Sequence, residues 1–300
     1  MPSSHSYIQD KRNKNVKIYI NGKFYTRKDA KISVFDSSVL LGDGVWDGLR
    51  YHNNNFLFLN DHLKRLYEDA KRIKLKIHIS KKNLIKLLNK IIKINKMETD
   101  VHIRLIISRG IKSTPYQDPS FTISLPSIII IPEYKKADKK IYSKGLKLTT
   151  VKTIRGPHNV QDPRINSLSK LNCILACIEA KKKNYDEGLM FDINGNIATN
   201  NSTHFFFIKN NKVYTSKGKF CVNGITRNNV IKICKKNNIK IFQKDFKLKE
   251  VLKADEAFVT GTFANIIPVN RINKKKFKLK NTNLTYRIRN HYLNLINNIW

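Results

Sequence analysis

The pattern of strands and helices in this chain starts, breaks off at a charged segment and starts again, and this break limits the fold more than any other feature. Residues Tyr134 to Lys144 (YKKADKKIYSK) are charged and lack a clear apolar period, which is typical of a linker. The 300 residues suffice for two modest cores, because domains usually hold about 100 to 150 residues. We therefore predict an N-terminal α+β domain over residues 1–134, a linker over 135–144 and a C-terminal α+β domain over 145–300.

Local patterns predict the elements of the first domain. Val16 to Tyr25 alternates around Asn21-Gly22, a pair that accepts the positive φ angles of a type I′ turn and so predicts a hairpin. Apolar residues of Asp61 to Ile73 recur at helical spacing. We also expect a second hairpin across Asn53–Asn55, a helix over Lys82–Ile94, and strands over Val101–Arg109 and Phe121–Ile131.

The second domain is predicted in the same way. A strand near Leu146–Val151 is followed by an irregular stretch over Arg155–Pro163 and a helix from about Ser167 to Lys183. The remaining expected elements are hairpins with tips at Asn194-Gly195 and Asn210-Asn211, a helix over Thr226–Asn237 and a helix near the C-terminus.

The formal net charge of +36 favours attraction to polyanions by counterion release. The lysines are scattered from end to end, however, and no nucleic-acid module stands out. We therefore interpret the positive charge as that of a solvated surface with a biased composition, and a basic nucleic-acid-associating protein is the alternative hypothesis.

Several classes of protein are excluded by what the sequence lacks. Four cysteines without CxxC spacing or clustered histidines predict neither a metal site nor a disulfide framework. The start, Met1 to Asn15, is polar, and the longest aliphatic run, Ile128 to Ile131, ends at Pro132. We expect a soluble cytoplasmic protein without membrane contacts.

Seven segments, in order, together resemble the class IV aminotransferases of the branched-chain and D-amino-acid type. Each segment alone is weak, but the set covers most of the chain. The segments are GDGVWDGLR (Gly42–Arg50), HLKRL (His62–Leu66), IRLIISRG (Ile103–Gly110), DPRINSL (Asp162–Leu168), YDEGLMFDINGNI (Tyr185–Ile197), NGITR (Asn223–Arg227) and ADEAFVTGT (Ala254–Thr262).

The resemblance implies the two-domain fold type IV, with pyridoxal 5′-phosphate bound between the domains and a homodimeric assembly. It implies that Arg50 contacts the cofactor phosphate, a task that suits the donor fork of a guanidinium. Because the GITR segment should open a helix, the backbone N–H groups of Ile225 and Thr226 would bind the same phosphate. Thr262 would add a hydroxyl.

For the substrates, an amino acid and a 2-oxo acid, Arg104 matches the arginine by which branched-chain members hold a carboxylate. Trp46 matches the aromatic residue that lines their substrate pocket. D-amino-acid members instead use an arginine and a histidine in a loop that here reads Thr114, Pro115 and Tyr116. The resemblance therefore favours a branched-chain-like substrate.

Two positions depart from the family pattern. Asn166 stands where the family has the lysine that forms the Schiff base, and an amide cannot form one. Lys170 lies four residues on and, if the helix has begun, would lie on the same face as Asn166 about 6 Å along the axis. It would also head an apolar stripe of Cys173, Ile174 and Cys177, which favours the neutral amine. We predict that Lys170 supplies the amine.

The second departure is Thr199, which replaces the glutamate that pairs with the pyridine nitrogen in this family. A hydroxyl stabilises a pyridinium less than a carboxylate does, so the cofactor would be a weaker electron sink. The leading hypothesis is an aminotransferase that uses Lys170. The alternatives are an altered lyase and a non-catalytic pseudoenzyme of the same fold.

Overall fold

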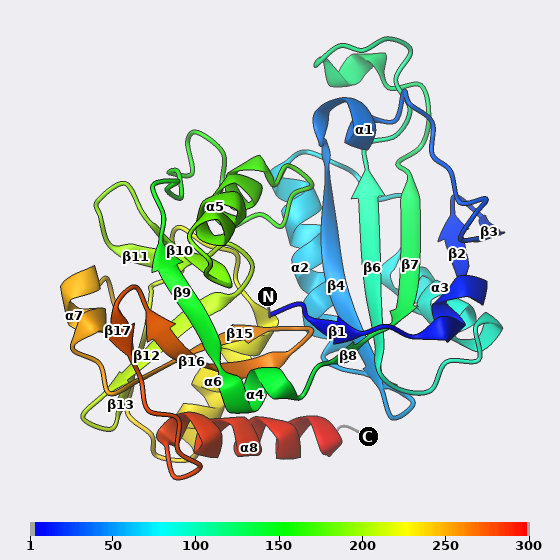
Figure 1. Ribbon diagram of the computed structural model, residues 1–300. Helices are drawn as coiled ribbons and strands as arrows, with labels where there is room; N and C mark the ends of the chain where they lie inside the picture. Colours follow the sequence, from blue (N-terminus) through cyan, green and yellow to red (C-terminus); the bar gives the residue numbers. More distant parts are fainter. Residues whose placement is uncertain (1–3, 299–300) are drawn as a thin grey trace. The chain divides into compact units, whose positions relative to one another are not determined.

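A six-stranded sheet and a nine-stranded sheet form the centres of two separate units of the chain (Figure 1). The computed structural model describes residues 4–298. The N-terminal unit consists of residues 8–136 and 165–169, and the C-terminal unit consists of residues 4–7, 137–164 and 170–298. The chain passes from one unit to the other between Lys136 and Ala137. Residues 4–7 and 165–169 thus lie outside the units that sequence order assigns to them.

The N-terminal unit is an antiparallel sheet in the order β3-β2-β7-β6-β4-β5, with α2 and α3 packed on it. Its elements are the 3-10 helix η1 (Lys11–Asn15), β2 (Lys17–Ile20), β3 (Lys23–Thr26), α1 (Ser37–Leu41), β4 (Gly44–His52), β5 (Asn55–Phe56), α2 (Leu59–Arg72), α3 (Lys81–Ile94), β6 (Val101–Ser108), the 3-10 helix η2 (Pro119–Phe121) and β7 (Ile128–Tyr134). Two further short strands, β1 (Tyr7–Ile8) and β8 (Lys136–Ala137), pair with each other.

Both hairpins predicted for this unit are confirmed. Asn21 and Gly22 have φ angles of 45° and 96°, and Asn53 and Asn54 have φ angles of 48° and 61°, as their two-residue turns require. The strand predicted from Phe121 begins only at Ile128. Residues 122–127 form a loop instead, where Pro126 has no N–H to donate to a ladder.

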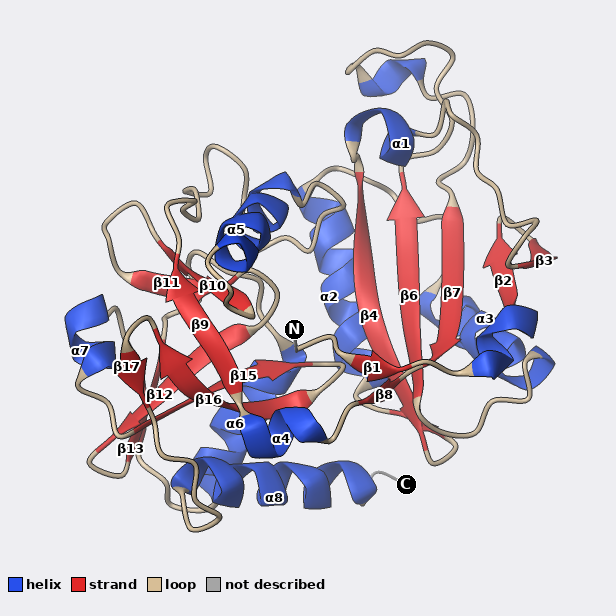
Figure 2. Ribbon diagram, in the orientation of Figure 1, coloured by secondary structure: helices blue, strands red, loops and turns tan. Residues whose placement is uncertain are grey.

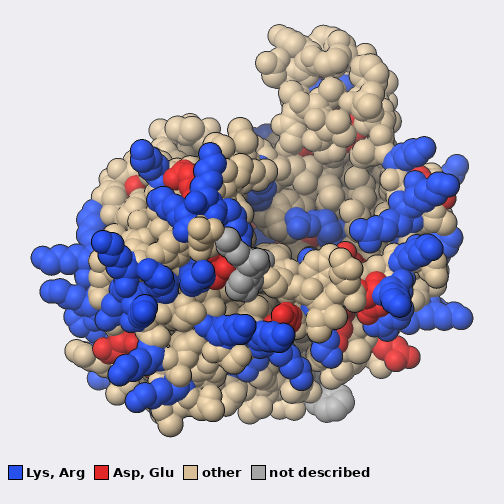
Figure 3. All heavy atoms as spheres, in the orientation of Figure 1, with Lys and Arg blue, Asp and Glu red and all other residues tan. Residues whose placement is uncertain are grey.

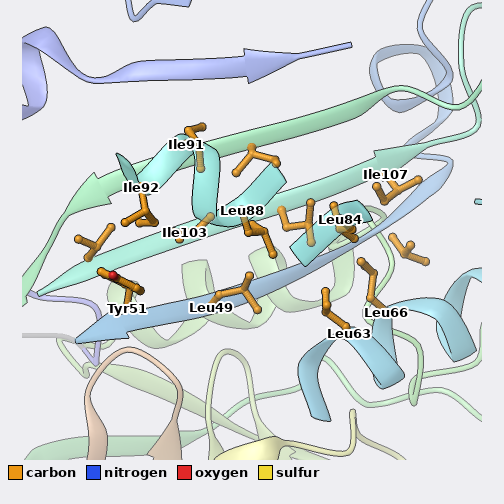
Figure 4. Packing of buried hydrophobic residues seen from close by; sticks show 14 of the residues in the cluster. Leu49, Tyr51, Leu63, Leu66, Leu84, Leu88, Ile91, Ile92, Ile103 and Ile107 are labelled. Carbon is orange, nitrogen blue, oxygen red and sulfur yellow. The ribbon is translucent and has the colours of Figure 1, made fainter. Parts of the chain in front are cut away.

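The core of the N-terminal unit lies between its sheet and the helices α2 and α3. Alternate residues of a strand point to one face, and Val45, Leu49 and Tyr51 of β4 point to the buried one. Figure 4 shows how leucines and isoleucines of both helices meet these strand residues. On the opposite face, β4 carries Trp46 and Arg50, and β6 carries His102 and Arg104.

The C-terminal unit is built on a mixed sheet in the order β11-β10-β9-β16-β15-β12-β13-β14, with β17 on β16. Helix α5 packs against β9 and β10, whereas α6 and α8 pack against β15 (Figure 2). The elements are α4 (Lys140–Lys144), β9 (Leu146–Thr150), α5 (Leu171–Lys182), β10 (Glu187–Phe191), β11 (Ile197–Asn200), β12 (His204–Lys209), β13 (Lys212–Thr215), α6 (Ile225–Lys236), β14 (Ile241–Gln243), α7 (Leu248–Leu252), β15 (Glu256–Gly261), β16 (Asn265–Ile272), β17 (Lys275–Lys276) and α8 (Leu284–Asn297).

Helix α5 corrects one prediction. It begins at Leu171, not near Ser167, and Lys170 is its N-cap with φ −120° and ψ 14°. The preceding residues are held in a different conformation because they pair with β4. None of the helices among residues 4–298 combines the length and the apolar character that a membrane span needs.

Candidate active site

The face of the N-terminal sheet opposite its core carries both residues predicted to meet substrate. Trp46 and Gly48 of β4 alternate with buried residues, and Gly48 lies directly opposite Arg104 of β6. A Cβ on Gly48 would lie 3.1 Å from Nε2 of His102 and 3.6 Å from the Trp46 ring. The glycine therefore leaves room for large side chains on this face.

Arg104 and Trp46 are in direct contact. The guanidinium carbon of Arg104 lies 3.5 Å from the centroid of the Trp46 ring, a cation–π geometry. Burial lowers the pKa of Arg104, and the Asp47 carboxylate opposes this shift. Arg104 makes no ion pair among the described residues. A half-buried guanidinium of this kind is suited to an anionic ligand.

Arg50 lies on the same face but is engaged with protein groups. Its Nη1 donates to the carbonyl of Lys135 at 2.7 Å, and its Nη2 lies 3.4 Å from Asp100 Oδ1. Its side chain is buried. The contact with a cofactor phosphate stays a prediction.

Lys135, which the sequence pattern assigns to the linker, also belongs to this group of cations. Burial lowers the pKa of its ammonium, Glu133 raises it, and the neighbouring Arg104 and Arg50 lower it again. Three cations therefore influence one another on this face. The sequence does not indicate this cluster because its three residues are far apart in the chain. The pairing of β6 with β7 brings Lys135 close to Arg104.

Asn166 is fixed to β4 and α2. Its N–H donates to Asp69 Oδ2 at 3.0 Å, its carbonyl accepts from Trp46 N–H at 3.0 Å, and its Nδ2 donates to the Trp46 carbonyl at 2.9 Å. Leu168 N–H donates to the Gly44 carbonyl at 2.9 Å. The segment thus pairs with the free edge of β4, which explains why residues 165–169 belong to the N-terminal unit.

The spacing argument for Lys170 was wrong, because no helical turn joins it to Asn166. The side chain of Lys170 is half-buried, and its carbonyl accepts from Ile174 N–H at 3.0 Å. The expected apolar stripe is also not a buried one, since Ile174 is 52% exposed and Cys173 and Cys177 are half-buried. Lys170 as the amine is therefore a prediction that rests on the resemblance alone.

In the C-terminal unit, helix α6 begins at Ile225, one residue before the predicted Thr226. Gly224 is the N-cap and has no side-chain capping bond, and Ile225 and Thr226 are buried. The first N–H groups of a helix have no partner within the helix. A Cβ on Gly224 would lie 2.6 Å from the ring of His204, so the glycine allows this ring to pack on the helix start.

The strand opposite His204 carries Thr260, and the predicted residue Thr262 follows that strand. His204 pairs with Thr260 across β12 and β15, and the buried hydroxyl of Thr260 has no hydrogen-bond partner among residues 4–298. Thr262 follows two residues later in a turn. Cross-strand partners share one face of a sheet, so the Thr260 hydroxyl lies on the face of the His204 ring. The sequence analysis did not single out Thr260.

Thr199 is buried beside the same strands. Its hydroxyl donates to the carbonyl of Thr203 at 2.9 Å, and Thr203 lies 3.6 Å from the position of a Cβ on Gly261. Because its hydrogen is used in this bond, Thr199 presents lone pairs. It can accept a hydrogen bond from a protonated pyridine nitrogen but does not carry the charge of a carboxylate.

These residues fit the phosphate of pyridoxal 5′-phosphate. Backbone donors at the start of α6 and the unpaired Thr260 hydroxyl are the groups that a phosphate needs. Residue 166, by contrast, offers no amine to bind the cofactor aldehyde covalently, because it is an asparagine whose amide is bonded to Trp46. Among the described residues, no group of three or more His, Cys, Asp or Glu side chains could hold a metal ion.

Comparisons with known proteins agree with this geometry. Residues 44–272 match the family model "Amino-transferase class IV". The chain is 34% identical over 265 residues to the "Putative branched-chain-amino-acid aminotransferase" of Methanocaldococcus jannaschii, which covers 86% of this chain and 88% of that protein. It is 28% identical over 263 residues to the D-alanine aminotransferase of Listeria monocytogenes, covering 86% and 88%. The crystal structure of the branched-chain aminotransferase of Thermoproteus uzoniensis with norvaline has a TM-score of 0.84 at 25% identity, covering 94% of each chain.

Proposed function

The chain belongs to the class IV aminotransferases, and from that premise we propose that it transfers an amino group between an amino acid and a 2-oxo acid with pyridoxal 5′-phosphate. The fold is that of the branched-chain aminotransferases, and we propose a branched-chain-like substrate in the cytoplasm. The observation that carries the cofactor proposal is the start of α6, where the first N–H groups have no partner within the helix. The His204 ring packs against Gly224 at this start and lies on the same sheet face as the unpaired hydroxyl of Thr260.

The cofactor, when bound, supplies the electron sink that loosens a bond at the substrate α-carbon. In our proposal, Arg50, Ile225, Thr226 and Thr262 bind its phosphate. Thr199 accepts a hydrogen bond from its pyridine nitrogen.

On the substrate side, Arg104 would bind the carboxylate. The Trp46 ring, 3.5 Å from the guanidinium, holds Arg104 in place and lines the pocket. Because Arg104 is half-buried and its pKa is lowered by burial, an incoming carboxylate would relieve the penalty of the unpaired cation. The site therefore favours a substrate with a carboxylate over an uncharged ligand.

Lys170 is the proposed amine, which would hold the cofactor aldehyde and move a proton at the substrate α-carbon. The test is reduction with borohydride. The Lys170 Nζ adds to the aldehyde with loss of water, and hydride from borohydride then reduces the carbon–nitrogen double bond to a stable label. Peptide mapping should place this label on Lys170.

Two variants sharpen this test. Lys170→Ala should lose the label and the transaminase activity. Lys183→Ala, which removes an exposed lysine from the other end of α5, should keep both. A label on no lysine, or an equal label on several lysines, would refute the relocation to Lys170.

One observation favours a second candidate, a pseudoenzyme that binds its ligand without covalent catalysis. The side chain of Asn166 is bonded to the Trp46 carbonyl, a contact that needs no cofactor. In that case purified protein would bind pyridoxal 5′-phosphate, and every lysine would remain unlabelled after reduction.

A homodimer is also part of the proposal, and exposed apolar side chains support it. In the N-terminal unit, the loop before β7 is bonded to the segment around α1, through Lys112 N–H to the Phe35 carbonyl at 2.9 Å. Figure 3 shows this end of the unit with hardly any Lys or Arg. Its exposed apolar residues include Val34, Phe35, Val39, Leu41, Ile123 and Leu125.

Helix α5 of the C-terminal unit has a second exposed apolar stripe, formed by Leu171, Ile174, Leu175 and Ile178 at helical spacing. Two chains of charge +36 repel each other, so they would meet where charge is absent. Sedimentation should show a dimer. Ile174→Glu should shift it to monomer, whereas Lys182→Glu, on the same helix, should not; a wild-type monomer would refute the proposal.

A further inference from the structure

Arg155 is a buried cation without a carboxylate partner. Its residue is 8% exposed, and no Asp or Glu side chain among residues 4–298 pairs with it. Burying a guanidinium in this way is unfavourable unless its donors are satisfied. Here uncharged acceptors satisfy the N–H donors of Arg155. The planar geometry of the guanidinium therefore matters at this position as much as its charge.

The guanidinium donates to three separate segments of the C-terminal unit. Nη2 donates to the Pro163 carbonyl at 2.9 Å, and Nε donates to the Phe220 carbonyl at 3.1 Å. Nη1 donates to Asn172 Oδ1 at 3.0 Å and to Cys173 Sγ at 3.2 Å. The backbone of Arg155 is itself fixed, because its N–H donates to the Phe191 carbonyl at 2.7 Å.

Two of these segments lead directly to proposed site residues. Asn172 and Cys173 lie in the first turn of α5, immediately after Lys170. Phe220 lies four residues before Gly224, the N-cap of α6. One rigid, planar group therefore bonds to the start of one helix and to the loop that leads into the other.

We infer that Arg155 is a positioning residue that fixes Lys170 relative to the phosphate-binding start of α6. This inference rests on the proposed function. A cofactor anchored at its phosphate reacts quickly with an amine only if the amine is held at the right place. Arg155 touches neither group; it sets the separation between them.

The test compares an aldehyde that carries the phosphate with one that lacks it. Pyridoxal 5′-phosphate should label Lys170 faster than pyridoxal, because the phosphate anchors the aldehyde near the amine. In Arg155→Lys, which keeps the charge but loses the planar fork, the ratio of the two labelling rates should fall about tenfold or more. Arg164→Lys is the matched control, since Arg164 is more exposed and pairs with Asp162 nearby.

A merely structural role would lower the melting temperature and leave this ratio unchanged, and that result would overturn the inference. Should Arg155→Lys fail to fold, Asn172→Ala removes one acceptor at a half-buried position and should lower the ratio in the same direction.

Failure of the proposed function is recognised separately. If wild-type protein labels no lysine, the relocation to Lys170 fails. Arg155 is then judged by the affinity for pyridoxine 5′-phosphate, which has no aldehyde and needs no amine. Arg155→Lys should weaken this affinity about tenfold through the Phe220 loop. Unchanged affinity, or no binding by the wild type, would overturn the inference as well.

Discussion

Replacing Asn166 tests whether its amide fastens residues 165–169 to the sheet. Asn166→Ala removes the 2.9 Å bond from Nδ2 to the Trp46 carbonyl and leaves the two backbone bonds of residue 166 in place. A lost hydrogen bond that leaves a partly buried carbonyl unsatisfied costs about 1 to 2 kcal/mol. We expect urea unfolding to show a loss of this size. Asn89→Ala, at an exposed helix position, should change stability by less than about 0.5 kcal/mol.

Asn166→Asp separates the hydrogen bond from the shape of the side chain. An ionised carboxylate cannot donate to the Trp46 carbonyl, and it would lie near the carboxylate of Asp69, so the loss at neutral pH should exceed that of Asn166→Ala. Burial and Asp69 would raise the folded-state pKa of the new carboxyl above its unfolded value. The stability deficit should therefore be largest at high pH and shrink as the pH falls through the folded pKa towards about 4, where the protonated group can donate.

Two results would refute this reasoning. An Asn166→Ala variant as stable as the wild type would mean that the amide contributes nothing to the attachment. An Asn166→Asp variant whose deficit does not depend on pH would mean that the side chain does not face the Trp46 carbonyl and Asp69 as described. Either outcome would reopen the possibility that Asn166 faces a ligand.

Two further predictions concern one buried group in each unit. Burial raises the pKa of Asp47, but Arg65 and His62 outweigh burial and lower this pKa to about 2. The ionised carboxylate therefore stabilises the fold at pH values above the pKa of Asp47 in the unfolded chain. About 2 kcal/mol should be lost as the pH falls from 4 to 2, and Asp47→Asn should flatten this acid limb of the unfolding curve. Gly224→Ala would place a Cβ 2.6 Å from the His204 ring and should weaken the binding of pyridoxine 5′-phosphate in a calorimetric titration. Gly156→Ala, with open space around its Cβ, should bind as the wild type does, and equal affinities for both variants would contradict the site.

Local sequence signals predicted most of the elements because the interactions that form them are short-range. The Asn21-Gly22 turn, the helix start at Ile225 and the amphipathic helices depend on residues a few positions apart. Alternation along β4 and β6 likewise separates the core face from the face that carries Trp46 and Arg104. The same signals failed for residues 122–127 and 167–170, where a proline or a distant strand decides the conformation.

The family, the expected cofactor and the departures at Asn166 and Thr199 were therefore determined by the sequence alone. Only the tertiary structure decided how those departures are accommodated. The partners of Asn166 lie 97 and 120 residues away, those of Arg155 reach 65 residues, and Lys135 meets Arg104 only because β6 pairs with β7. Hydrogen bonds of this range follow from packing, which no local propensity specifies. They attach Asn166 to β4 and α2, and they join Arg155 to the first turn of α5 and to the loop before α6.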